Sequence, residues 1–136
     1  MNPQQVRQVA NRFIDQLHRL EQGDPAEAED MAGLFADNAK LSNPLIEGDG
    51  GARAGREAIV RFWREYKDSF RDIHSEFTDI TMGAQSAGLF WFSSGTAADG
   101  KPLQYKGVTQ LVLDDAGKIC SFTGYFDSAA LRGKRS

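Results

Sequence analysis

The sequence contains very little cysteine, histidine and proline: one, two and four residues in a chain of 136. The single cysteine, Cys120, excludes an internal disulfide, and its apolar strand-like surroundings predict a buried, unreactive thiol. Neither histidine has a second histidine at ligand spacing, so no metal site is predicted. His18 is expected to be exposed on a helix, and His74 to lie on a sheet face. We therefore expect a fold stabilised by its apolar core, with no metal and no other cofactor.

Long apolar runs and an excess of positive charge are also absent. No stretch approaches the roughly 20 apolar residues that a membrane-spanning helix needs, and the N-terminus has no apolar signal segment. The net charge of -3 argues against non-specific nucleic-acid binding, which needs a clustered positive surface. Residues 132–136 are basic and are expected to form a flexible tail. The sequence thus predicts a cytoplasmic protein that binds neither nucleic acid nor membrane.

The composition that remains is that of a globular protein. Hydrophobic residues make up 40% of the chain and charged residues 26%, which excludes a disordered polymer. A length of 136 residues predicts one domain, residues 1–136, that can bury an apolar core without disulfides.

Three helices are predicted in the first half of the chain. Apolar residues at helical spacing indicate a helix over Pro3 to Gln22. A second helix begins at Asp24-Pro25, where Asp24 is a suitable cap and Pro25 fits the first turn. A third covers residues 56–69. The expected buried face of the second helix consists of Ala28, Met31, Leu34 and Phe35.

A short strand is predicted between the second and third helices, over residues 39–42. It ends at Asn43-Pro44 because proline cannot donate to a strand ladder. The following residues 47–55 contain four glycines and indicate a flexible loop.

The second half of the chain predicts four strands joined by hairpin-type turns. The strands are expected at residues 73–80, 89–94, 103–113 and 119–126. Turn sequences rich in glycine, aspartate and serine separate them, which is typical of an antiparallel meander. Helices followed by a meander give an α+β fold with the helices on one face of the sheet.

This order of elements resembles the nuclear-transport-factor-like superfamily, also called SnoaL-like or ketosteroid-isomerase-like, over nearly the whole chain. The resemblance implies a cone-shaped, cystatin-like α+β fold, with three N-terminal helices packed in a curved, mainly antiparallel sheet. It also implies a cavity for a small apolar or aromatic ligand, and homodimers formed through the outer sheet face. The motifs that carry it are Phe35-Ala36-Asp37-Asn38-Ala39, Asn43-Pro44, Gly55-Arg56-Glu57-Ala58-Ile59, Gly117-Lys118-Ile119 and Tyr125-Phe126-Asp127 before Leu131.

Strand alternation then predicts which side chains face the cavity. If Thr109 faces inward, so do Tyr105, Gly107 and the other odd-numbered residues from 103 to 113. On the last strand the inner face is expected to hold Cys120, Phe122, Gly124 and Phe126. The apolar residues Val108, Val112 and Ile119 are expected on the outer face.

The catalytic groups known from this superfamily are missing at the corresponding positions. The resemblance places the aspartate base of ketosteroid isomerase at Asn43, its tyrosine at Phe13 and its second aspartate at Thr109. An amide takes up no proton near neutral pH, so Asn43 cannot act as that base. The aspartate of SnoaL-like cyclases and epoxide-hydrolase-like enzymes falls on Gly124. Of the groups that the hydrolases use, only the water-positioning asparagine is matched, by Asn43.

The candidate ligand-binding residues are therefore the polar groups near the expected cavity and the aromatic rings beside them. Trp63 and Tyr66 have helical spacing and could equally be core residues, and Asn43 could equally belong to an Asn-Pro turn that bonds to the backbone. Tyr105 could equally satisfy its hydroxyl at the rim of the sheet. The full set is Phe13, Asn43, Trp63, Tyr66, Tyr105, Thr109 and Phe122.

Two hypotheses for function follow. The first is a SnoaL-like isomerase, cyclase or hydrolase of a small apolar molecule, in which Asn43, Tyr105 and Thr109 orient the substrate. The second is a non-catalytic ligand-binding or dimerisation module on the same scaffold. Protein transport, the role of the namesake factor, has no further support in the sequence.

Overall fold

The computed structural model describes residues 2–23, 26–48 and 51–130. The predicted Asp24-Pro25 helix start and the predicted tail at residues 132–136 lie outside this part of the chain. The elements, in chain order, are α1 (Pro3–Gln22), α2 (Glu27–Ala32), β1 (Phe35–Ser42), α3 (Pro44–Gly48), β2 (Arg53–Ala54), α4 (Arg56–Asp68), β3 (Phe70–Met82), β4 (Ser86–Ala97), β5 (Pro102–Leu113), β6 (Ile119–Phe126) and the 3-10 helix η1 (Ser128–Ala130).

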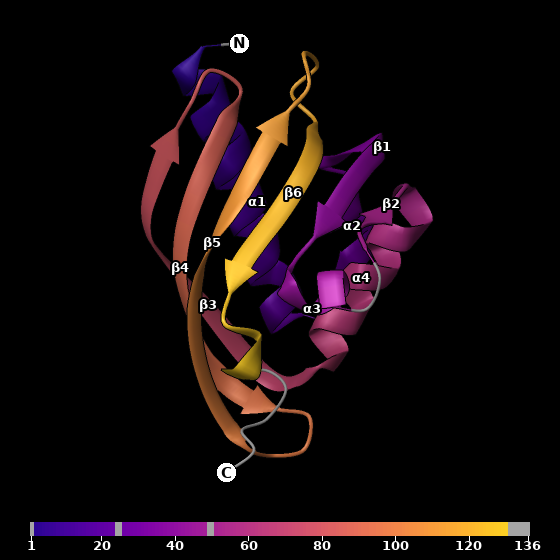
Figure 1. The fold of residues 1–136 in the computed structure, drawn as a ribbon, viewed down its shortest axis with the longest axis vertical. Helices are drawn as coiled ribbons and strands as arrows, with labels where there is room; N and C mark the ends of the chain where they lie inside the picture. Colours follow the sequence, from indigo (N-terminus) through magenta and orange to yellow (C-terminus); the bar gives the residue numbers. More distant parts are fainter. Residues whose placement is uncertain (1, 24–25, 49–50, 131–136) are drawn as a thin grey trace.

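The six strands form one sheet in the order β2-β1-β6-β5-β4-β3. Strands β3 to β6 are an antiparallel meander, and β1 pairs in parallel with β6. Figure 1 shows that the long strands are strongly curved and that α1, α2 and α4 all lie on one side of the sheet. The expectation of an α+β fold with a curved, mainly antiparallel sheet is confirmed.

Helix α1 has the bounds that the sequence predicts. The side chain of Asn2 accepts a hydrogen bond from the backbone of Gln5, and the Gln5 side chain bonds back to Asn2, which forms a capping box at the start of the helix. The apolar stripe packs inward, and Phe13 and Leu20 are fully buried. Among the described helices, none is long and apolar enough to cross a membrane.

The second helix is shorter than predicted, and the first strand is longer. Helix α2 ends at Ala32, so Leu34 and Phe35 do not belong to its buried face as expected. Gly33 terminates the helix, and the backbone of Leu34 accepts a hydrogen bond from the Ile119 amide at 3.0 Å. Because of this pairing with β6, Phe35 belongs to β1. Tertiary contacts decide this assignment, and the periodicity of the local sequence does not indicate it.

Strand alternation is confirmed on β5 and is wrong for two residues, Ile119 and Cys120, at the start of β6. Tyr105, Thr109 and Leu111 are buried, whereas Gln110 is exposed. Ile119 was expected on the outer face but is fully buried. The register shifts there, because Leu113 pairs with Ile119 while Val112 pairs with Ser121. Cys120 was expected to be a buried thiol on the inner face. It is instead the extra residue of this bulge and is only half-buried.

Candidate functional site

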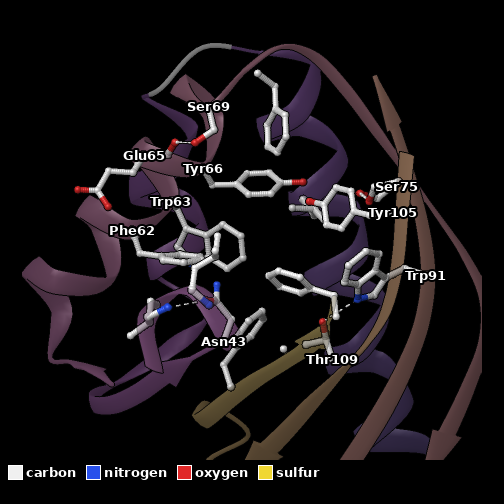
Figure 2. Close-up of a pocket in the computed structure, with 18 of the residues that line it drawn as sticks. Asn43, Phe62, Trp63, Glu65, Tyr66, Ser69, Ser75, Trp91, Tyr105 and Thr109 are labelled. Carbon is white, nitrogen blue, oxygen red and sulfur yellow. Dashed lines mark hydrogen bonds between the residues drawn. The ribbon is translucent and has the colours of Figure 1, made fainter. Parts of the chain in front are cut away.

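All seven candidate residues line one cavity between the helices and the concave face of the sheet. Its volume is about 300 Å³. The residues come from α1 (Phe13), the end of β1 (Asn43), α4 (Trp63 and Tyr66), β5 (Tyr105 and Thr109) and β6 (Phe122). Figure 2 shows the labelled side chains arranged around the open space.

The wall of this cavity is mainly aromatic. The rings of Phe13 and Phe122 have centroids 5.6 Å apart, and the Trp63 ring lies 6.0 Å from Phe13 and 5.5 Å from Phe122. Such tilted and edge-to-face pairs fix the rings in place. Phe13 and Trp63 are 2% exposed, so they belong to the core and also line the cavity. Trp63 is therefore both a core residue and a residue that lines the cavity, so the two interpretations from the sequence do not exclude each other.

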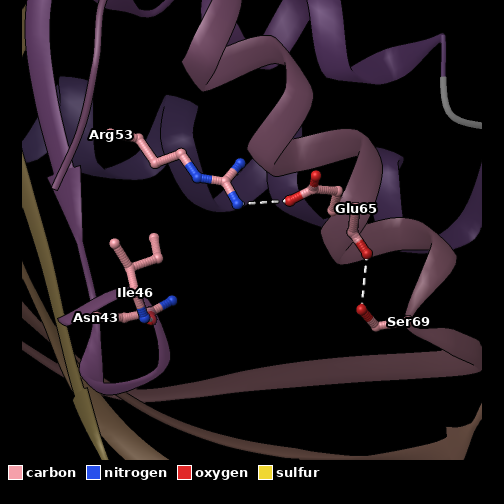
Figure 3. Close-up of polar contacts among 5 residues, drawn as sticks. All are labelled: Asn43, Ile46, Arg53, Glu65 and Ser69. Atoms are coloured by element: carbon pink, nitrogen blue, oxygen red, sulfur yellow. Dashed lines mark hydrogen bonds and ion pairs between the residues drawn. The ribbon is translucent and has the colours of Figure 1, made fainter. Parts of the chain in front are cut away.

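Asn43 has a defined structural role. Its Oδ1 accepts hydrogen bonds from the backbone amides of Leu45 and Ile46, both at 2.9 Å, and so holds the start of α3 (Figure 3). The Asn-Pro turn interpretation is thus confirmed, and Asn43 also lines the cavity. Because Oδ1 is the acceptor, the amide NH2 group remains, and it has no hydrogen-bond partner among the described residues.

Thr109 is held by a tryptophan that the sequence analysis did not select. The Trp91 indole Nε1 donates to the Thr109 Oγ1 at 2.9 Å. This contact needs Gly107 on the neighbouring strand, because a Cβ there would lie 2.7 Å from the Trp91 ring and 2.2 Å from the Tyr125 carbonyl oxygen. The Thr109 oxygen accepts, so its own hydroxyl hydrogen is left for a ligand.

Two buried N–H groups beside the cavity have no partner among the described residues. They are the Arg53 Nη1 and the Trp63 Nε1. The other terminal nitrogen of Arg53 forms a 2.8 Å ion pair with Glu65 (Figure 3). The guanidinium carbon of Arg53 lies 5.9 Å from the centre of the Phe62 ring. Sequence analysis missed Arg53 because it lies in a predicted loop, where β2 in fact pairs with β1.

The second feature missed from the sequence is a buried carboxylate at the C-terminal end of α1. Glu21 is only 3% exposed. It accepts hydrogen bonds from the Ser75 amide (3.0 Å), the Ser75 hydroxyl (2.6 Å) and the Tyr66 hydroxyl (2.7 Å). A signal was present: Glu21 lies four residues after Leu17 and one after Leu20, within the apolar stripe of the helix.

The tyrosines nearest to this carboxylate are held in their neutral form. Burial raises the pKa of Tyr66 well above its ordinary value, and the electrostatic interactions with Tyr105 and Glu21 act in the same direction. Burial and Glu21 also raise the pKa of Tyr105. Both phenols can form hydrogen bonds to a ligand, but neither is suited to give up its proton near neutral pH.

The two histidines lie side by side, although they come from α1 and β3. Their rings stack with centroids 5.2 Å apart, and the half-buried His18, which was expected to be exposed, bonds through Nε2 to the Ser75 carbonyl oxygen at 2.8 Å. His18, Glu21 and His74 each offer one ligand atom within 4.8 Å of the others. However, the carboxylate already accepts three hydrogen bonds, so this arrangement does not favour a metal ion.

The four positions at which the resemblance places catalytic groups of other family members all line the cavity. They are Phe13, Asn43, Thr109 and Gly124. Among the described lining residues, the only carboxylate is that of Glu65, which is paired with Arg53. The arrangement therefore provides hydrogen-bond donors and aromatic contacts, but no free carboxylate base inside the cavity.

Comparison with known proteins agrees with this architecture. Residues 10–122 match the family model of the SnoaL-like domain. No curated protein matches the chain. Similar solved structures include an NTF2-like protein from Anabaena variabilis ATCC 29413, with a TM-score of 0.79 and 19% identity over 93% of this chain and 92% of that one.

Two further structures share the fold at low identity. An NTF2-like protein of unknown function from Exiguobacterium sp. 255-15 gives a TM-score of 0.73 and 21% identity, over 88% of this chain and 98% of that one. SalBIII, an epoxide hydrolase/cyclase-like enzyme in pyran ring formation in the polyether salinomycin, gives a TM-score of 0.75 and 14% identity, over 93% of this chain and 94% of that one. At these identities the likeness concerns the fold.

Proposed function

The chain belongs to the SnoaL-like domain family, and from that premise we propose that it binds a small, mainly apolar or aromatic molecule in the cavity. A volume of about 300 Å³ is at the lower end of the range for small-molecule sites. The aromatic wall formed by Phe13, Trp63 and Phe122 supplies the apolar contact. A few polar groups beside it would fix the orientation of the ligand.

The observation that carries this proposal is the pair of unpartnered N–H groups of Arg53 and Trp63. A buried donor without an acceptor costs about 1–3 kcal/mol. Both residues line the cavity, and a ligand oxygen that reached either nitrogen would recover this free energy. Asn43 and Thr109 offer further hydrogens at the same cavity.

Catalysis is the second candidate, and one contact favours it. The Tyr66 hydroxyl lies 2.7 Å from Glu21, so a buried carboxylate is connected to the cavity through a phenol. Such a pair could move a proton in an isomerase, cyclase or hydrolase reaction. The raised pKa of Tyr66 opposes that role, which is why we place ligand binding first.

The test of ligand binding is a cavity-filling variant. A Cβ at Gly124 would lie 3.5 Å from the Asn43 side chain, an ordinary contact, so Gly124→Val adds its methyl groups to the cavity with little strain. The wild type should bind 2-naphthol in calorimetry, and Gly124→Val should lose at least tenfold in affinity. Thr123→Val, on the adjacent position of β6 outside the cavity lining, is the matched control. Equal affinity in all three proteins would overturn the proposal.

The test of the second candidate is proton exchange in a bound ketone. If Glu21 and Tyr66 move protons, 4-phenyl-2-butanone should exchange hydrogens beside its carbonyl with D2O faster in the presence of the protein. Glu21→Gln should abolish this acceleration. Absence of exchange in the wild type would overturn the catalytic role.

We also propose that two copies of the chain pair through the outer sheet face. Its large exposed apolar side chains, Phe90 (38%), Phe92 (39%) and Tyr125 (56%), lie on β4 and β6. Val108 of β5 pairs with both Phe90 and Tyr125, so one apolar row crosses three strands. The helices lie on the opposite side of the sheet (Figure 1), which leaves this row available to a second copy.

A further inference from the structure

We propose that the cavity has a hydrogen-bond polarity, with acceptors at one end and donors at the other. It would therefore select a small apolar molecule with a hydroxyl group at one end and a carbonyl or carboxylate oxygen at the other. This inference rests on the proposed function, because it specifies the ligand of the same cavity. The polarity follows from where each hydroxyl hydrogen is already used.

At the first end the Glu21 carboxylate fixes the direction of the hydroxyl groups. An ionised carboxylate has no hydrogen to give, so each partner must donate to it. Tyr66 and Ser75 each donate their only hydroxyl hydrogen to the Glu21 carboxylate, with oxygen–oxygen distances of 2.7 and 2.6 Å. The oxygens of both residues then have only lone pairs left, and both residues line the cavity.

The same direction extends one residue further. The hydroxyl oxygens of Ser75 and Ser93 are 2.6 Å apart, and geometry alone allows either to donate. Because the Ser75 hydrogen is directed to Glu21, Ser93 must be the donor. Tyr66, Ser75 and Ser93 thus present acceptor oxygens, while the neutral Tyr105 hydroxyl beside Ser93 keeps its hydrogen. A ligand hydroxyl, which can accept from Tyr105 and donate to these oxygens, is the neutral group that this end fits. Moving an ammonium ion from water into this site would cost much more desolvation free energy than moving a hydroxyl group.

At the other end, Asn43, Thr109 and Arg53 offer donors, and the one carboxylate among the described lining residues, Glu65, already accepts from Arg53. The Oδ1 atom of Asn43 is occupied by the amides of Leu45 and Ile46, which leaves its NH2 group. The oxygen of Thr109 is occupied by the indole of Trp91, which leaves its hydroxyl hydrogen.

Arg53 adds the Nη1 group, which is buried and unpartnered among the described residues. Its ion pair with Glu65 already balances the charge, so this end favours a neutral carbonyl over a carboxylate, which would compete with Glu65 for the guanidinium.

The two ends are separated in space by the aromatic wall. Figure 2 shows Asn43 and Thr109 in the lower part of the cavity, whereas the Tyr66 hydroxyl, Tyr105 and Ser75 lie in the upper part. Figure 3 shows Arg53 and Asn43 extending to the same side from neighbouring segments. A ligand that spans the cavity would meet donors and acceptors in that fixed order.

The experiment measures four related probes by calorimetry on the full chain. The probe 3-(4-hydroxyphenyl)propanoate carries both groups, 3-phenylpropanoate lacks the hydroxyl, and 4-propylphenol lacks the carboxylate. The neutral ketone 4-(4-hydroxyphenyl)-2-butanone separates a carbonyl from a carboxylate as the preferred acceptor. We expect the better of the two bifunctional probes to bind about tenfold tighter than either probe with one group, which corresponds to about one hydrogen bond.

Two nearly isosteric variants identify the ends. Tyr66→Phe removes one acceptor oxygen and should weaken the hydroxylated probes about tenfold, while 3-phenylpropanoate is unchanged. Asn43→Asp keeps the oxygen that holds α3 but replaces the NH2 donor by an acceptor. It should weaken the probes with a carbonyl or carboxylate about tenfold and leave 4-propylphenol unchanged. Circular dichroism on each variant checks that the fold is retained.

The outcomes separate this inference from the proposed function. If all four probes bind with the same affinity and Gly124→Val weakens them equally, the cavity binds ligands but the polarity is wrong. If none of the probes and no 2-naphthol binds, the proposed function itself fails. If each variant weakens all probes alike, the two residues act on the fold of the cavity, and the assignment of ends is overturned.

Discussion

The hydroxyl of Tyr66 donates to the carboxylate of Glu21 at 2.7 Å, and this contact joins α4 to the C-terminal end of α1. The same carboxylate holds the amide and hydroxyl of Ser75 on β3, and the Lys67 ammonium donates to the Glu21 carbonyl oxygen at 2.7 Å. One residue thus connects two helices and an edge strand around the cavity.

Replacing Glu21 should destabilise the fold. In Glu21→Ala the Ser75 amide and the two hydroxyls lose their acceptor, and each buried donor left without one costs about 1–3 kcal/mol. Because the hydroxyls can turn to other partners, we expect a total loss of about 3 kcal/mol in the free energy of unfolding. Urea denaturation measures it. The control is Glu76→Ala, which replaces an exposed glutamate next to Ser75 on β3. It should change the free energy of unfolding by less than about 0.5 kcal/mol. Similar losses in both variants would contradict the structural role of Glu21.

The stability of the protein should fall at alkaline pH through the buried tyrosines. The folded state raises the pKa of Tyr66 and of Tyr105 above the ordinary value of about 10. The stabilising contribution is therefore complete below about pH 10, where both states keep the phenol hydrogen. Above it the unfolded chain releases the hydrogen while the folded protein retains it, so stability falls as the pH rises.

The measurement is the free energy of unfolding at several pH values between about 9 and 11. Tyr66→Phe removes one of the two responding groups and should reduce the slope relative to the wild type. A slope in Tyr66→Phe equal to that of the wild type would show that the Tyr66 phenol does not differ between the two states.

Gly107 should tolerate no side chain. A Cβ there would lie 2.2 Å from the Tyr125 carbonyl oxygen and 2.7 Å from the Trp91 ring, so Gly107→Ala must displace β6 or the indole. Overpacking of this kind costs about 1–3 kcal/mol. Gly124→Ala is the matched control, since its Cβ would meet other atoms only at 3.5 Å or beyond. In thermal denaturation, Gly107→Ala should have a clearly lower melting temperature than the wild type, and Gly124→Ala should not. Equal melting temperatures would disprove the close packing of Trp91.

The proposed dimer depends on the apolar row of the outer sheet face. Tyr125→Glu places a charge at the most exposed apolar side chain of the row and should raise the dimer dissociation constant at least tenfold. Analytical ultracentrifugation gives the mass of each species. Glu57→Lys, an exposed charge change in the first turn of α4 on the helix side, should leave the mass unchanged. A wild type that is monomeric at high concentration would refute the dimer.

Much of the fold could be predicted because local rules agree with it. Alternation placed Tyr105 and Thr109 on the inner face, and helical spacing gave the bounds of α1. The errors occur where distant segments decide. Phe35 joins β1 through its pairing with β6, and the bulge after Val112 turns Ile119 inward. Neither contact leaves a periodic pattern in its own segment.

For the site, the sequence identified seven of the side chains that line the cavity, but not Arg53 or Trp91. The resemblance also predicted that Asn43 and Gly124 stand where other family members carry carboxylates. Only the tertiary structure decided what these groups can do. Glu21 lies 54 positions before Ser75 and 45 before Tyr66 in the sequence, and Arg53 reaches the cavity through the pairing of β2 with β1. A hydrogen bond has a direction only once its partner is known, and long-range packing supplies the partners.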